Sequence, residues 1–128
     1  MDRRRAVLEK LYRAALAGVD PAAAVARAFE DPALARKAAE ARRIAVFSCG
    51  KAAAAMARGV PSGIFARGLV IVPRGGAVAA PRSDVDLDVL EASHPDPDAS
   101  SVAAARAAVR FFESFGPGDL VLCLISGG

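Results

Sequence analysis

The chain has 128 residues and a net charge of +3, with 54% hydrophobic and 24% charged residues, which is the composition of one globular domain and excludes a disordered chain. Its arginines alternate with acidic residues and lack interleaved aromatic side chains, which favours solvated helix faces over a nucleic-acid-binding surface. No apolar run reaches the ~20 residues of a membrane helix, and charged residues interrupt the N-terminal segment too early for a secretory signal.

The first part of the chain predicts helices. Residues 3–17 carry an apolar stripe of helical period, and Gly18 marks a stop after it. Asp20 and Asp31 each precede a proline, which is the arrangement of an N-cap followed by proline at the first helical position, so two further helices are expected. We expect residues 1–42 to form a helical lead-in that packs on a sheet.

From residue 43 onward, short apolar strands alternate with helices. Strands are predicted at residues 43–48, 68–73, 87–91 and 120–125, helices at 51–60 and 99–115, and a loop at 77–86. The last strand is apolar throughout, as in a strand covered on both faces. One face of the last helix carries Val102, Ala105, Val109 and Phe112. The alternation implies an α/β fold over residues 43–128, with a mostly parallel, Rossmann-like sheet and helices on both faces.

The two cysteines, Cys49 and Cys123, each lie near the end of an apolar run. They form no CxxC pair and have no metal-ligand spacing. We expect them to be buried thiols of a cytoplasmic protein, and we predict no metal site in the chain.

The most informative segment joins the strand at 43–48 to the next helix. After the strand comes Gly50, and an alanine-rich helix then begins with Lys51. This order brings a sheet edge, a helix N-terminus and an ammonium group to one point, which suits a phosphate or a carboxylate. Only three of the 17 basic residues are lysines, and lysine is the compact charge that can follow a moving phosphoryl group. Lys51 is therefore either a phosphate ligand or a solvated residue of the first helical turn.

Polar residues also follow the other strands, and in a parallel sheet all these strand ends meet at one edge. The four segments expected there are 48–51, 74–76, 94–98 and 126–128. Arg74 is either a clamp for a carboxylate or an exposed arginine. His94 is either a general base or a loop residue whose ring bonds to backbone. Ser126 is either a phosphate-binding hydroxyl or a chain-end residue.

The loop that contains His94 is rich in proline and aspartate. Asp96 and Asp98 are either turn-forming residues or ligands that assist a magnesium ion. Ser100 or Ser101 is expected to be the N-cap of the helix that follows.

Three segments resemble the type II glycerate kinases, also called glycerate 2-kinases, of the MOFRL-associated family. The matching text is CGKAAAAMA at residues 49–57, EASHPDPD at 91–98 and DLVLCLISGG at 119–128. The middle segment departs from the family's usual Gly-His-Pro-Val-Pro-Asp-Glu at Ser93, Asp96 and Ala99.

The resemblance implies transfer of the γ-phosphoryl group of ATP, with Mg²⁺, to D-glycerate to give 2-phosphoglycerate. It implies that Lys51 contacts the transferred phosphate and that the loop Ser126-Gly127-Gly128 helps to hold a ligand. Gly50, Arg74 and His94 complete the set of candidate binding residues.

In the family the glycine loop continues, so we expect this chain to be the N-terminal piece of such a kinase, an incomplete domain that is inactive alone and self-associates through residues 120–125. The alternative is an α/β module that binds a sugar phosphate or small anion without kinase chemistry.

Overall fold

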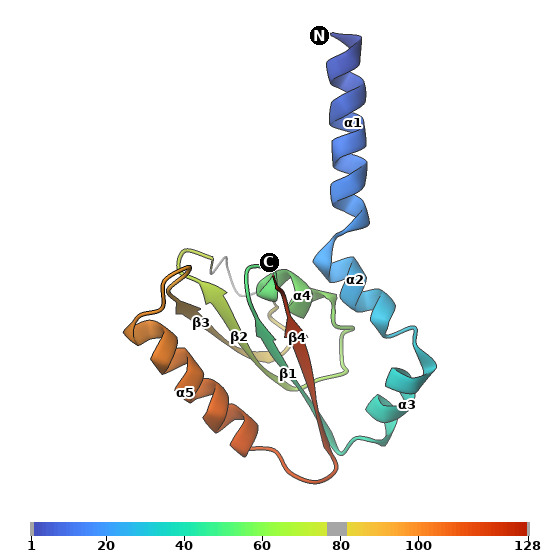
Figure 1. Ribbon diagram of the computed structural model, residues 1–128. Helices are drawn as coiled ribbons and strands as arrows, with labels where there is room; N and C mark the ends of the chain where they lie inside the picture. The colour runs from blue at the N-terminus through green and yellow to red at the C-terminus, as the bar shows by residue number, and fades with distance from the viewer. Residues whose placement is uncertain (1, 77–81, 128) are drawn as a thin grey trace.

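The computed structural model describes residues 2–76 and 82–127, and its centre is a four-stranded parallel sheet in the order β3-β2-β1-β4 (Figure 1). The strands are β1 (Arg43–Cys49), β2 (Arg67–Pro73), β3 (Asp86–Ala92) and β4 (Asp119–Ile125). The predicted α/β fold with a parallel sheet is confirmed, and each predicted strand is present to within one residue at either end. Part of the predicted loop, residues 77–81, lies outside the described residues.

Helices cover both faces of this sheet, because the strands direct apolar side chains to both faces. On one face, α4 (Ala53–Gly59) and α2 (Pro21–Ala28) pack around a buried cluster of Val25, Val46, Val60 and Phe65. On the other face, α5 (Ala99–Glu113) packs on a second cluster, which consists of Ala45, Phe47, Leu69 and Phe111.

The lead-in consists of α1 (Arg3–Gly18), α2 and α3 (Pro32–Glu40), and both predicted aspartate caps are confirmed. Asp20 accepts a hydrogen bond from the Ala23 amide at 2.9 Å, and Asp31 accepts one from the Ala33 amide at 2.8 Å. The helix α1 has no buried residue and projects away from the sheet (Figure 1). The prediction that it packs on the sheet is therefore wrong, because its apolar stripe meets no partner among the described residues. Gly18 is the last helical residue rather than the stop.

The helix α5 begins at Ala99 as predicted, but its N-cap and its buried face differ from the prediction. Its N-cap is Asp98, which accepts a hydrogen bond from the Ser100 amide at 2.8 Å, while the Ser101 hydroxyl accepts one from the Asp98 amide at 3.3 Å. The serines therefore assist the cap but do not form it. Phe111 is 4% exposed, whereas Phe112 is 40% exposed, because the helix presents a neighbouring stripe to the sheet.

The last strand, β4, forms one edge of the sheet and pairs with β1 alone among the described residues. Its Cys123 side chain is exposed, and Ile125 is 65% exposed. In the described part of the chain this strand is therefore an open edge, as its expected self-association requires. The prediction of a buried Cys123 is wrong. Cys49, in the adjacent strand, is half-buried.

The amino ends of β1 and β4 are joined by Asp119, whose side chain has no exposed surface. Its carboxylate accepts hydrogen bonds from Arg42 at 3.0 Å, from Arg43 at 2.6 Å and from the Gly116 amide at 3.0 Å. The hydrogen bond from Arg43, followed by those from Arg42 and Gly116, holds the pKa of Asp119 well below its ordinary value.

We expect Asp119→Asn to lower the free energy of unfolding at neutral pH and to weaken its dependence on acid. The pKa of Asp119 is lower in the folded than in the unfolded chain, so the ion pairs stabilise the fold above the unfolded pKa of about 3.9. That contribution is lost as the pH falls through this value toward the folded pKa. Urea unfolding between about pH 2 and pH 7 measures both effects. Asp88→Asn, at an exposed carboxylate outside the ion pairs described, is the matched control.

Candidate functional site

The turn between β1 and α4 is built on a glycine with a positive φ. Gly50 has φ +111°, and its amide donates to the Ile71 carbonyl at 3.1 Å. Its carbonyl accepts from the Ala53 amide at 3.1 Å, which closes the turn. A Cβ atom at Gly50 would lie 2.2 Å from the Ser126 Oγ atom, so only glycine fits between the turn and the end of β4.

Lys51 lies in this turn and is exposed. The helix α4 begins at Ala53, so the prediction of a helix from residue 51 is wrong by two residues. The amides of Ala52 and Ala53 already have acceptors, namely the Ser126 Oγ atom at 3.2 Å and the Gly50 carbonyl. The Lys51 amide has no acceptor among the described residues. An anion at this turn could therefore bind the Lys51 ammonium group and the Lys51 amide, but not the amides of the first helical turn.

Ser126 ties the end of β4 to the same turn. Its amide donates to the Cys49 carbonyl at 3.1 Å, and its hydroxyl accepts from the Ala52 amide. The hydroxyl of the fully buried Ser48 can donate to either of two carbonyl oxygens. Its Oγ atom lies 2.9 Å from the Ala53 oxygen and 3.2 Å from the Leu124 oxygen. Two serines therefore hold β1, β4 and the start of α4 in a fixed arrangement.

A cavity of about 370 Å³ opens at this edge of the sheet. It is lined by Gly50, Lys51, Ala52, Pro73, His94, Ser126 and Gly127. Five of the predicted site residues are thus brought together, whereas Gly128 lies outside the described residues. The sequence analysis missed Ala52 and Pro73, although both lie at or near the carboxyl ends of strands that it had placed at this site. Neither has a chemically active side chain, so reasoning from side-chain chemistry does not find such positions.

His94 lies in the loop between β3 and α5 and is exposed. Its ring forms no hydrogen bond within the part of the chain that the structure describes, so the backbone-bonded alternative is not observed. The imidazole is therefore available to a ligand in the cavity that it lines with Lys51.

Arg74 lies beside the cavity and is not among its lining residues. Its guanidinium donates to the Asp98 carboxylate at 3.0 Å and to the Ser100 hydroxyl at 3.2 Å. The pKa of Asp98 is held below its ordinary value first by hydrogen bonds from Ser100 and then by Arg74. Asp98 thus acts as a capping residue and takes the position that a substrate carboxylate would need. The role of Arg74 in ligand binding stays a prediction.

Residues 2–76 and 82–127 contain no group of three or more histidine, cysteine or acidic side chains that could hold a metal ion. Over the same residues, no helix has the length and apolar character needed to cross a membrane.

A parallel sheet with helices on both faces, and a small cavity at the carboxyl ends of its strands, defines a Rossmann-like α/β fold. The chain belongs to the family described as "Domain of unknown function (DUF4147)", whose model matches residues 7–128.

Similar proteins include a glycerate kinase (EC 2.7.1.31) from Thermotoga maritima, with a TM-score of 0.68 and 25% identity over 92% of this chain and 27% of that one. The PH0495 protein from Pyrococcus horikoshii OT3 gives a TM-score of 0.57 and 30% identity over 67% of this chain and 19% of that one. A "putative hydroxypyruvate reductase" from Agrobacterium vitis is 38% identical over 97% of this chain and 26% of its own length. The predicted resemblance to the glycerate kinases is confirmed. The chain spans about a quarter of the length of these relatives or less.

Proposed function

We propose that this chain forms part of an ATP-dependent glycerate 2-kinase, which transfers the γ-phosphoryl group of ATP to D-glycerate. The observation that carries the proposal is the position of Lys51, which lines the cavity at the strand ends and whose amide has no acceptor among the described residues. The likeness to the Thermotoga maritima glycerate kinase supports the same activity.

The residues around the cavity suit the charge of a phosphoryl group in transfer. The Lys51 ammonium would neutralise charge on the moving group, and the amides of Lys51 and Gly127, which have no acceptor among the described residues, would donate to its oxygens. Gly50 has no side chain, which leaves room for Ser126 beside the turn.

His94 would hold the glycerate hydroxyl, because it lines the same cavity and its ring has no hydrogen bond among the described residues. The phosphorus–oxygen bond to glycerate forms as the bond to ADP breaks, and the hydroxyl proton leaves to solvent or to His94. Positioning and charge neutralisation supply most of the catalysis in such reactions, so a strong base is not required.

ATP supplies the phosphoryl group when it is bound, and Mg²⁺ neutralises the nucleotide's charge. The described residues offer no cluster of metal ligands, so we expect the ion to be held mainly by phosphate oxygens and water.

The name of the Agrobacterium vitis relative raises reductase chemistry as a second possibility. A nicotinamide dinucleotide is commonly bound by a G-x-G-x-x-G turn after the first strand. Here the turn at residues 48–53 reads SCGKAA and contains one glycine and a lysine. The kinase is therefore the better match to this turn.

The test is a hybrid of the Thermotoga maritima glycerate kinase in which this chain replaces the matching region. We expect ADP release with D-glycerate at an ordinary kinase rate of about 1–100 per second. A folded hybrid that oxidises NADH with hydroxypyruvate and releases no ADP would contradict the proposal. If the hybrid does not fold, NMR titration of the 128-residue chain with MgATP decides. Shifts at the amides of Gly50, Lys51 and Gly127 are expected, and their absence would overturn the assignment of the site. A folded hybrid that binds MgATP without turnover would indicate the binding-module alternative.

A further inference from the structure

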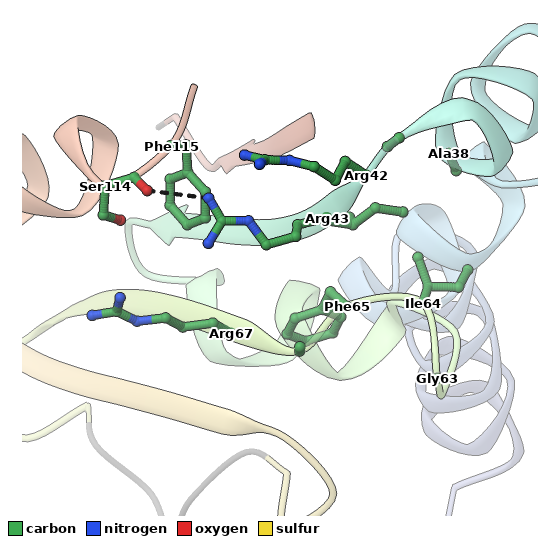
Figure 2. Close-up of a pocket in the computed structure, with 12 residues that line it drawn as sticks. Ala38, Arg42, Arg43, Gly63, Ile64, Phe65, Arg67, Ser114 and Phe115 are labelled. Carbon is green, nitrogen blue, oxygen red and sulfur yellow. Dashed lines mark hydrogen bonds between the residues drawn. The ribbon is translucent and has the colours of Figure 1, made fainter. Parts of the chain in front are cut away.

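A second cavity, of about 550 Å³, lies at the amino ends of β1 and β2 (Figure 2). The candidate site lies at the carboxyl ends of the same strands. The size of the second cavity lies within the range of small-molecule sites. Three arginines, Arg42, Arg43 and Arg67, contribute to its lining, and none of its lining residues is acidic. Figure 2 shows the three side chains extending in the same direction, with Ser114 and Phe115 beside Arg43.

Two of these guanidinium groups are held in place by a single buried carboxylate. Asp119 accepts two hydrogen bonds from Arg42, both at 3.0 Å, and two from Arg43, at 3.2 and 2.6 Å. The Arg43 guanidinium also lies 5.4 Å from the centre of the Phe115 ring and donates to the Ser114 carbonyl. Each arginine keeps one terminal nitrogen without a partner among the described residues. Cations that are fixed in this way lose little side-chain entropy when they bind an anion.

The third guanidinium, that of Arg67, is not bonded to a carboxylate among the described residues, although Asp86 is the register partner of Arg67 in β3. It forms no ion pair or hydrogen bond in the described part of the chain, and its only ring contact there is with Phe111, at 5.7 Å from the ring centre. Asp88 shares a neighbouring groove with Arg67 and Arg110 but forms no ion pair with either. Three arginines thus contribute to the lining, and Asp119 is bonded to two of them, Arg42 and Arg43.

Most of the remaining lining is apolar and includes Ile44, Ile64 and Phe65. We propose that this cavity binds a small organic anion, in which a phosphate or carboxylate group is joined to an apolar body. The charged group would bind the guanidinium groups, and the apolar body would contact the isoleucine and phenylalanine side chains. This cavity lies at the amino ends of the strands, whereas Lys51 lies at their carboxyl ends. The proposed anion site is therefore independent of the proposed kinase function.

The test is calorimetric and NMR titration of the 128-residue chain with phenyl phosphate, with benzoate and with the neutral analogue benzyl alcohol. Saturable binding of at least one anion is expected, with shifts at residues 42, 43 and 67, and no saturable binding of benzyl alcohol. The stronger of the two anions identifies the charged group. Binding of benzyl alcohol with equal affinity, or of neither anion, would overturn the proposal.

The decisive variant is Arg67→Gln, which leaves the hydrogen bonds of Asp119 intact. Loss of a charge-assisted hydrogen bond should weaken anion binding about tenfold. Arg110→Gln removes an equal charge from the neighbouring groove and is the matched control, for which we expect a change within about twofold. Equal losses in both variants would show a general charge effect and would contradict a specific site. Circular dichroism confirms that each variant is folded.

Discussion

Lys51→Ala is expected to lower kcat for glycerate phosphorylation about 100-fold or more in the hybrid kinase, while the KM for glycerate changes only a few-fold. An interaction that forms mainly with the transferring phosphoryl group is lost chiefly in the transition state, and a 100-fold loss corresponds to about 2.7 kcal/mol of barrier. Lys51→Arg should restore little activity, because a forked guanidinium does not take the position of an ammonium. Steady-state kinetics with varied glycerate and saturating MgATP separates the two parameters.

Lys37→Ala is the matched control, because Lys37 is an exposed lysine in α3 and does not line the cavity. Its kcat should stay within about twofold of the parent value. If Lys51→Ala leaves kcat within about threefold, which is under ~1 kcal/mol of barrier, then Lys51 is a solvated turn residue. In that case the anion would have to bind to backbone amides alone. Should the hybrid be inactive, the MgATP titration of the chain and its Lys51→Ala variant provides the comparison.

Gly50→Ala is expected to lower the free energy of unfolding by about 1–3 kcal/mol or more. The new Cβ atom would lie 2.2 Å from the Ser126 Oγ atom and 2.6 Å from its carbonyl oxygen, and φ at this residue is +111°. The turn or the end of β4 would have to move, which separates Ser126 from the Ala52 amide. The same change should therefore abolish the response of the Lys51 amide to MgATP.

Gly127→Ala is the control for this prediction, because a Cβ atom there meets nothing within 4 Å and the residue lines the same cavity. Urea unfolding of both variants measures the stability difference, and we expect Gly127→Ala to stay within about 0.5 kcal/mol of the parent. A Gly50→Ala variant as stable as Gly127→Ala would show that the turn adapts easily and that glycine is not required there.

The parts of the fold that depend on local pattern could be predicted. The apolar runs locate all four strands, and the Asp-Pro pairs at residues 20 and 31 locate two helix starts, because an aspartate cap needs only its own neighbours. The start of α4 was misplaced for a non-local reason. The Ala52 amide is bonded to Ser126, which lies 74 residues away, and no local pattern reports that contact.

Burial was harder to predict than secondary structure. The helix α5 has two apolar stripes, one with Phe111 and one with Phe112, and the crossing of the helix over the sheet determines which is buried. The candidate site could be predicted in part, because the segments that follow parallel strands lie together at the carboxyl ends of those strands. Arg74 shows the limit of that reasoning, because its neighbour Asp98 occupies the guanidinium and the sequence alone did not show that pairing.

The contacts of Ser126 have a consequence for the order in which the site forms. During synthesis, β1 and the turn at Gly50 emerge long before β4, yet the turn is completed only when Ser126 reaches Cys49 and Ala52. The cavity therefore cannot exist until β4 has joined the sheet. A ligand that needs this cavity would bind only the joined state, so its binding energy would also oppose the detachment of an edge strand that has one neighbour among the described residues. Occupancy of the cavity and retention of β4 in the sheet would thus be thermodynamically linked.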